Sequence, residues 1–336
     1  MTDKDAGSGW GPAEEQQRAV AAEFAAQVRS GAVDLPLPGG GRTAERWAVL
    51  GALSGRDLSL GRLCEGHADA LAILAELGGP EVGVPEPAAG GIWGVWAAQP
   101  PGPRLTARRS GQDWLLDGVK QYCSGARVCT DALVTAVAPD GPRLFAVSTA
   151  QLEPIRGTWP ATGMAGSDTL DVRFPGVSGV PVGPPGAYTD RPGFAHGGAG
   201  VAACWLGGAR AVGQTLLAQA AARDVGPHAL AHLGAVDVAL STGADALRVA
   251  AAEIDADPAD VKQAARLRTM RVRALIEQVA SETLSRVGRA LGAGPLCHDE
   301  AHGRRVADLT VYLRQHHADR DLAALGAVVA ETRPAW

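Results

Sequence analysis

The stretch GVKQYCSG, residues 118–125, decides how this chain is interpreted. It continues an apolar, β-rich run and ends on small residues and a glycine, a pattern typical of a strand that stops at a turn. Tyr122 offers an aromatic face for a planar ring, and the Ser124 hydroxyl and nearby backbone amides can hydrogen-bond to the edge of such a ring. Taken alone, the stretch also fits an ordinary strand end, so its meaning depends on the surrounding sequence.

A β-rich region surrounds this stretch, and no segment of helix length separates its strands. We therefore expect an antiparallel sheet, folded as a small barrel or a sandwich. The pairs Asp117-Gly118 and Asp140-Gly141 fit turns. The expected strands are Ile92–Ala97, Trp114–Lys120, Ala132–Val137, Leu144–Val147 and Leu170–Phe174.

Helical patterns lie on both sides of this region. Before it, three helices are expected over residues 12–30, 43–53 and 57–77, the last stopped by Gly78-Gly79-Pro80. After it, four long helices are expected over residues 198–223, 229–254, 257–291 and 303–325, with Asp257-Pro258 opening the third. The sequence thus predicts an α+β fold: an N-terminal helical domain (1–88), a middle antiparallel β-barrel or sandwich domain (89–190) and a long C-terminal four-helix bundle (191–336).

Composition excludes several classes of protein. The 336 residues carry 31 basic and 36 acidic side chains, a net charge of −5, so no basic excess exists to bind nucleic acid. The longest apolar stretch, near residues 197–209, is too short and too glycine-rich to cross a membrane. The first ten residues are polar, so no signal peptide is expected, and five widely spaced cysteines fit reduced thiols in the cytoplasm.

Several familiar motifs are absent from the sequence. No dinucleotide-binding G-x-G-x-x-G joins a strand to a helix, and no P-loop occurs. The pair His298 and His302 flanks a glutamate in an order that matches no zinc protease, so no metal site is expected. Cys64 and His67 point in different directions on a helix, so a joint role is not expected, although Asp69 on the same helix can join a pocket rim.

Together with these surroundings, residues 118–125 resemble the acyl-CoA dehydrogenase superfamily over almost the whole chain. In that family a strand reading roughly G-x-K-x-W-I-T-N-G ends against a flavin, and here Tyr122 takes the tryptophan position and Ser124 the threonine position. An earlier T-E-P-G strand end is similar to residues 98–101. A later G-x-x-G-S-x-T motif is matched by residues 163–169.

The resemblance implies FAD as cofactor, with FMN as the alternative. The residues implied to bind it beside the sheet are Ala97, Ala98, Tyr122, Cys123 and Ser124. Two motifs in the bundle resemble family segments that reach the cofactor pyrophosphate of a neighbouring subunit, which implies a homodimer or homotetramer formed through the bundle. The residues implied there are Arg223, His232, Arg289, Gly292 and Ala293.

The sequence departs from the family at the catalytic base. His316 stands where the family has its glutamate, and the alternative glutamate position falls near Ala199. Because Leu309, Leu313 and His316 are spaced as one helix face, His316 is expected to point inward as the acid–base residue. His317 is the competing choice, about 100° round the helix. Asp319 and Arg320 are expected within reach of His316, to set its tautomer or lower its pKa.

The family reaction implies the principal hypothesis for function. A base takes the α-proton of an acyl-type small-molecule substrate while the β-hydrogen leaves as hydride to flavin N5. One alternative is a flavin-dependent monooxygenase on the same fold, since some superfamily members use reduced flavin and oxygen and some carry histidine in place of the glutamate. Another is a non-catalytic partner protein, which the loss of both acid positions favours.

Overall fold

Three helices open the described part of the chain. The computed structural model describes residues 12–78, 90–102 and 104–334, so the first ten residues, the Gly79-Pro80 helix stop and the predicted boundary at 88/89 lie outside it. The helices are α1 (Pro12–Arg29), α2 (Thr43–Arg56) and α3 (Leu58–Leu77), close to the predicted ranges. The Asp57 carboxylate accepts a hydrogen bond from the Leu60 amide at 3.0 Å and so caps α3.

The middle of the chain forms one sheet, which together with the helices gives the expected α+β fold. Its strands are β1 (Trp93–Trp96), β2 (Thr106–Ser110), β3 (Asp113–Cys123), β4 (Asp131–Ala138), β5 (Gly141–Ser148), β6 (Glu153–Ile155) and β7 (Leu170–Pro181). The pairings run from β4 through β2, β3, β7 and β5 back to β4, although β2 and β4 share a single pair of residues. The expectation of a purely antiparallel sheet is wrong, because β1 and β2 both pair with β4 in parallel.

Two further strand predictions need correction. Asp117-Gly118 is not a turn: it lies inside β3, where the register against β7 shifts between Leu116 and Asp117. Gly118 has a φ of 124°, a conformation that glycine adopts at little cost, so the pair forms a bulge within a long strand. β2 is a strand that was not expected, because it reads TARRS, exposes four of its five residues and so lacks the apolar alternation that predicts a strand. Asp140-Gly141 does form the turn between β4 and β5, as expected.

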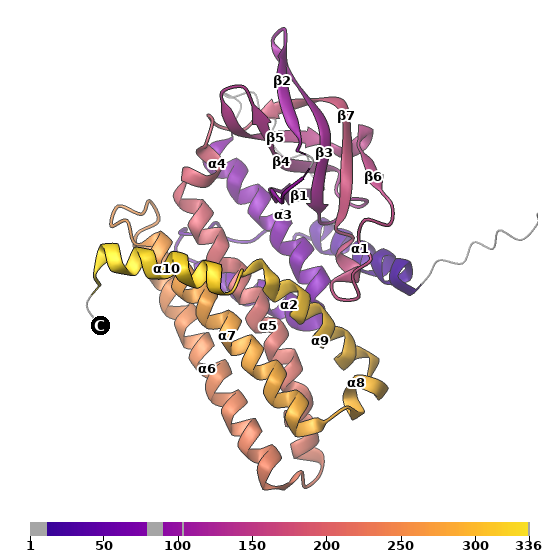
Figure 1. Cartoon of the computed structure of the whole chain (residues 1–336), viewed down its shortest axis with the longest axis vertical. Helices are drawn as coiled ribbons and strands as arrows, with labels where there is room; N and C mark the ends of the chain where they lie inside the picture. The colour runs from indigo at the N-terminus through magenta and orange to yellow at the C-terminus, as the bar shows by residue number, and fades with distance from the viewer. Residues whose placement is uncertain (1–11, 79–89, 103, 335–336) are drawn as a thin grey trace, which may run out of the picture.

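Long helices make up the rest of the chain. They are α5 (Pro192–Ala222), α6 (Gly226–Ala256) and α7 (Ala265–Leu291), preceded by the short α4 (Ala187–Asp190) and followed by α8 (Gly294–His298), α9 (Glu300–Tyr312) and α10 (Asp319–Thr332). In Figure 1, α5, α6 and α7 run side by side below the sheet, and the turn between α5 and α6 lies at the far end. No helix among the described ranges is long and apolar enough to span a bilayer.

The predicted starts and ends of two long helices are wrong for local reasons. The third does not begin at Asp257, which instead accepts hydrogen bonds from the amides of Val261 and Lys262 in the turn after α6. Asp260 and Gln263 have positive φ values of 51° and 52°, which interrupt helical geometry until Ala265. The fourth helix is divided into α9, a 3₁₀ turn at Leu313–Gln315, and α10.

Helix α3 links the sheet to the long helices. On one side, the Trp93 amide of β1 donates to His67 Nδ1 at 3.1 Å, in a fully buried hydrogen bond. On the other side, Leu58 of α3 packs against α5, where a Cβ atom at Gly208 would lie 2.7 Å from the Leu58 side chain. Both contacts fix how the sheet and the helices sit relative to each other.

The His67 contact makes stability depend on pH. Burial lowers the pKa of His67 to about 4, from 6.5. An unfolded chain binds the proton near pH 6.5 and the folded chain only near 4, so the free energy of unfolding should fall as pH drops through this window, by up to about 3 kcal/mol. Urea denaturation between pH 7.5 and 4 measures this slope. His67→Gln keeps an acceptor but cannot titrate, so a slope unchanged in that variant would rule the explanation out.

Candidate active site

The ends of β1 and β3 meet at one place. Trp96 Nε1 donates to the Ser124 carbonyl at 2.9 Å, and the Thr135 hydroxyl donates to the Ala97 carbonyl at 3.4 Å. Ala97 is half-buried and Ala98 is exposed. The structure therefore brings Ala97 and Ser124 to neighbouring strand ends, with the exposed Ala98 following Ala97.

Tyr122 presents its ring outward at this surface. Its φ of 58° lies in the left-handed region, and its side chain is 48 % exposed. Such a backbone costs on the order of 1–3 kcal/mol for a non-glycine residue, so the surroundings must hold it. The Tyr122 amide donates to Asp171 at 3.4 Å, and the ring stands edge-on to Trp159 with centroids 6.4 Å apart. One face of an aromatic ring is thus held open to solvent.

Ser124 is held by the later motif at residues 163–169. Its side chain is only 9 % exposed, and its hydroxyl oxygen accepts a hydrogen bond from Thr169 Oγ1 at 3.0 Å. Thr169 Oγ1 in turn lies 2.7 Å from the Ser167 hydroxyl. Because a hydroxyl that accepts a bond still carries its own hydrogen, Ser124 keeps a donor for the edge of a ligand ring.

Other predicted cofactor residues lie elsewhere. The Cys123 side chain is fully buried in the core of the sheet, where its thiol donates to the Lys120 carbonyl at 3.3 Å, so only its backbone can touch a ligand. The residues expected at the pyrophosphate lie at or near the end of the long helices that is remote from the sheet (Figure 1). They are Arg223, His232, Arg289, Gly292 and Ala293. One copy of the chain does not bring them to Tyr122.

His316 points inward, but not because of a helix face. The helix ends before it, and His316 adopts extended geometry on the connection between the 3₁₀ turn and α10. It is 4 % exposed, whereas the side chain of His317 is 52 % exposed. Burial lowers the pKa of His316, so the imidazole is neutral at pH 7.

The expected neighbours of His316 also change. Asp321 and Glu277, not Asp319, are the carboxylates that act on His316 and partly oppose the lowering of its pKa. Arg273 and Arg314, not Arg320, are the arginines that lower it further. The backbone turn at Ala318, with a φ of 46°, directs α10 away from the line of α9 and so changes which side chains face the ring.

A buried polar group lies between α3, α5 and α9. Arg62 pairs with Glu65 at 2.6 Å. Burial raises the pKa of Glu65 to about 7, and the nearby Asp69 raises it further, while the charge of Arg62 partly opposes the shift. Tyr312 from α9 is 2 % exposed and interacts electrostatically with Arg62 and Glu65. Arg62 also acts electrostatically on the Cys129 thiol, and Cys129 lies against Gly125, the residue after Ser124.

Arg273 of α7 continues this group toward His316. Its guanidinium lies 4.7 Å above the Trp205 ring, and it donates to the Gly198 and Gln315 carbonyls at 3.0 and 2.9 Å. Trp205 also stands edge-on to Tyr312, with centroids 6.3 Å apart. We call Arg62, Glu65, Tyr312, Arg273, Trp205 and His316 the junction cluster.

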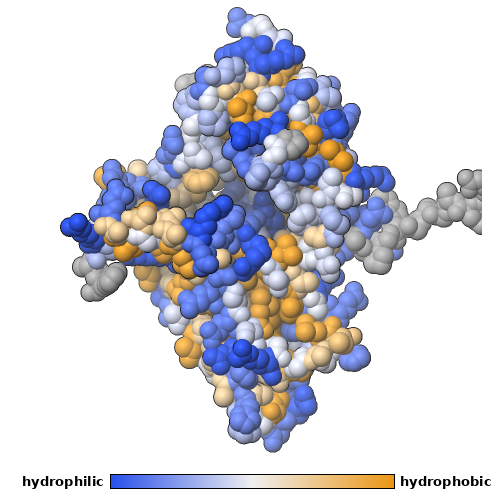
Figure 2. Space-filling view, in the orientation of Figure 1, coloured by the Kyte–Doolittle hydropathy of each residue, from blue (hydrophilic) through white to orange (hydrophobic). Residues whose placement is uncertain are grey.

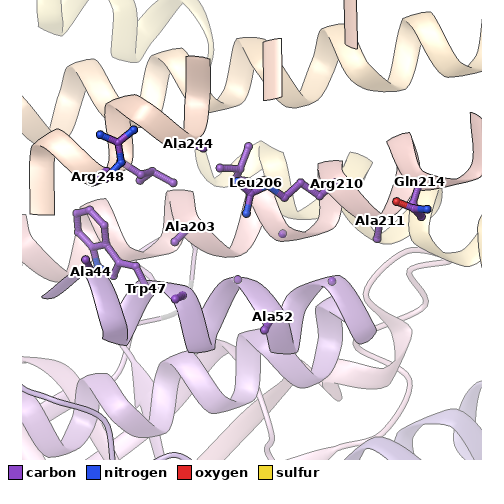
Figure 3. A pocket seen from close by; sticks show the side chains of 15 residues that line it. Ala44, Trp47, Ala52, Ala203, Leu206, Arg210, Ala211, Gln214, Ala244 and Arg248 are labelled. Carbon is purple, nitrogen blue, oxygen red and sulfur yellow. The ribbon is translucent and has the colours of Figure 1, made fainter. Parts of the chain in front are cut away.

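Two features of the surface are relevant. Figure 2 shows a hollow between the sheet region and the helices below it, on the face where α9 and α10 run. A separate open groove of about 580 Å³ lies between α2, α5 and α6, and Figure 3 shows Trp47, Leu206 and Arg210 around it. No residue expected to contact the cofactor lines that groove, so we place the candidate active site at the end of β3 and the junction cluster.

Most of the junction cluster was missed at the sequence level. Arg62, Glu65 and Asp69 follow helical spacing on an otherwise apolar helix, which was a usable signal for a buried ionic group. Tyr312 and Trp205 carried no such signal, because apolar and aromatic residues fill the core faces of most helices. Arg273 lies in a helix rich in arginine, so nothing distinguished it from a surface residue.

Comparison with solved structures identifies proteins that share this fold, two of them crystallised with FMN. TdsC from Paenibacillus sp. A11-2, a dibenzothiophene monooxygenase crystallised with FMN and indole, matches with a TM-score of 0.77 and 19 % identity over 94 % of this chain and 96 % of TdsC. Methanesulfinate monooxygenase MsuC from Pseudomonas fluorescens gives 0.75 and 19 % over 97 % and 98 %.

KijD3, crystallised with FMN and a dTDP-linked amino sugar, gives a TM-score of 0.72 and 19 % identity over 98 % of this chain and 96 % of KijD3. No protein-family model matches the sequence, and no curated protein matches it. At these identities the likeness establishes the fold, and the resemblance seen in the sequence is confirmed at that level.

Proposed function

We propose that this protein is a flavin-dependent monooxygenase that acts on a small organic molecule. The observation that carries the proposal is His316: it is a buried imidazole with a lowered pKa, at the position that the sequence resemblance aligns with the carboxylate base of the dehydrogenases. The monooxygenases TdsC and MsuC, which share the fold, support this reading.

The residues at the end of β3 fit a flavin. Tyr122 offers an open aromatic face, Ser124 keeps a hydroxyl donor, and Ala97 and Ala98 leave space beside them. Reduced flavin, when bound, would supply the electrons with which one oxygen atom enters the substrate and the other leaves as water. We propose FMN first, since TdsC and KijD3 hold FMN, and FAD as the alternative.

The chain's own residues then have separate tasks. Tyr122 and Ser124 would orient the flavin ring, and the junction cluster would bind the substrate on the helical side. His316, neutral at pH 7 and with Nδ1 free of any partner in the described structure, would accept a proton from the substrate or return one. Dehydrogenation of an acyl-type substrate remains the second candidate, because the same imidazole can take an α-proton.

One experiment separates these functions. Purified protein is mixed with FMN or FAD, the flavin is reduced chemically, and oxygen uptake and product mass are followed with candidate substrates. A product heavier by one oxygen atom supports the monooxygenase. Flavin reduction by an acyl substrate without oxygen would instead support the dehydrogenase, and failure to bind either flavin would indicate a non-catalytic partner protein.

Tyr122→Ala tests where the flavin lies. Losing one stacked aromatic ring should weaken flavin binding by about 1–3 kcal/mol, the range for a base stacked on an aromatic side chain. Fluorescence titration with FMN measures the change. Tyr188→Phe, at a half-buried tyrosine of α4, is the control and should leave the affinity unchanged. Equal affinity in Tyr122→Ala would place the flavin elsewhere.

We further propose a homodimer or homotetramer formed through the long helices. Arg223 and Arg289 are exposed at the end of α5 and α7 that is remote from the sheet. If they bind the cofactor phosphate, as the resemblance implies, the phosphate must belong to a site on another copy. We also propose that the protein is located in the cytoplasm, because its five widely spaced cysteines fit reduced thiols.

A further inference from the structure

Arg273 is a cation without an anionic partner. No carboxylate of the described residues lies within 4 Å of its guanidinium, and its hydrogen bonds go to two neutral carbonyls. Burial accordingly lowers its pKa, because a charge removed from water is costly unless an opposite charge compensates it.

The nearby carboxylates are already engaged. Glu65 pairs with Arg62 at 2.6 Å. Asp321 accepts a hydrogen bond from the His317 amide at 3.0 Å and lies 3.5 Å from the His317 ring. Neither can turn fully to Arg273 without leaving another group unpaired.

Two buried polar atoms around Arg273, Trp205 Nε1 and His316 Nδ1, have no hydrogen-bond partner among the described residues, and the Tyr312 hydroxyl meets only the Cys204 thiol, a weak partner. The residues Tyr312, Trp205 and His316 are 2 %, 0 % and 4 % exposed. A hydroxyl and an indole N–H both donate hydrogen bonds, and the imidazole can do so in one tautomer. Unpaired buried donors beside an unpaired cation are what a bound oxyanion would satisfy.

We propose that Arg273, with Tyr312 and Trp205, binds an oxyanion carried by the substrate, so that the substrate is a small organic carboxylate or sulfonate. This rests on the proposed function, since it places the anion beside His316, on the helical side of the flavin. Arg273 would anchor the charged end, and the rest of the molecule would extend toward Ser124. The matched neutral amide or sulfonamide would leave the guanidinium uncompensated and bind more weakly.

Calorimetry on the flavin-free protein tests the proposal without any turnover. The probes are acetate, benzoate and benzenesulfonate, each compared with its neutral partner: acetamide, benzamide or benzenesulfonamide. At least one anion should bind about tenfold or more tightly than its neutral partner, as expected for one charge-assisted hydrogen bond. If no anion exceeds its neutral partner, the proposal is wrong.

Variants locate the binding. Arg273→Gln should abolish the preference for the anion, Arg273→Lys should retain part of it, and Tyr312→Phe, which removes only a hydroxyl, should weaken anion binding several-fold. Arg210→Gln is the control, because Arg210 is exposed in the groove of Figure 3 and has no ion-pair partner in the described structure. Anion binding lost in Arg210→Gln and kept in Arg273→Gln would overturn the assignment.

The two proposals fail separately. Anion binding that depends on Arg273 in a protein that takes up no oxygen would refute the monooxygenase and support the oxyanion site. Oxygenation of a neutral substrate with equal efficiency in Arg273→Gln would support the monooxygenase and refute the oxyanion site.

Discussion

Replacing His316 with alanine should lower turnover by about 10²–10⁴-fold, the usual contribution of a positioned acid–base residue, which corresponds to roughly 3–5 kcal/mol of barrier. Flavin affinity should not change, because the proposed flavin contacts lie at the end of β3. Steady-state oxygen uptake and flavin titration on the same preparations measure the two effects independently.

His317→Ala is the matched control for this prediction. Its side chain is half-exposed and contacts Asp321, so activity should remain within about a factor of two of the unchanged protein. Activity lost in His317→Ala and retained in His316→Ala would reverse the assignment. The pH profile adds a second readout: because burial lowers the pKa of His316, protonation of this imidazole should reduce activity only below pH 6.5. Glu65 of the junction cluster is separate from this effect, because its pKa of about 7 places its titration nearer neutrality.

Gly207→Ala should destabilise the protein by about 2–3 kcal/mol. The added methyl group would lie 2.1 Å from the Gly51 carbonyl oxygen, whereas ordinary contacts begin at 3.4 Å, so α2 and α5 must move apart by about 1 Å or more. This cost exceeds the roughly 1 kcal/mol that alanine gains over glycine inside a helix. Urea denaturation at pH 7.5 gives the difference.

Gly234→Ala isolates the contact from the helix propensity. Gly234 lies inside α6, and a Cβ atom there would meet nothing within 4 Å. The same substitution should therefore stabilise the protein by about 0.5–1 kcal/mol. If both variants shift the denaturation midpoint in the same direction, the close approach of α2 and α5 does not limit stability.

The helices before the sheet could be predicted because local signals set their ends. Asp57 caps α3 through its own side chain, and the apolar spacing of α1 continues without interruption. The break between α6 and α7 was not predictable in this way. Asp257 followed by proline is typical of a helix N-terminus, yet its carboxylate accepts hydrogen bonds within a turn. Two residues with positive φ then keep the chain out of helical geometry before α7 begins. Local composition did not distinguish these two uses of one aspartate.

In the candidate site too, the residues of one short motif could be predicted from the sequence, whereas residues from separate helices could not. Tyr122 and Ser124 lie in a contiguous motif, so one short stretch pointed to both. The inward direction of His316 is as predicted, but the reason for it is different. The prediction places His316 on a helix face, whereas the helix ends before it and the side chain is buried on an irregular connection. Arg273 and Tyr312 come from separate helices and meet only after packing. Such pairs follow from tertiary structure, which a single sequence does not display.

The length of α5 has a consequence for how cofactor binding responds to dilution. Its 31 residues span about 46 Å, and they separate the sheet end of the molecule from Arg223. If the phosphate contacts come from a neighbouring copy, half of each binding site is supplied by association between chains. Apparent flavin affinity would then rise with protein concentration and reach a plateau once the oligomer is fully formed. By the same linkage, the bound cofactor would stabilise the association between subunits.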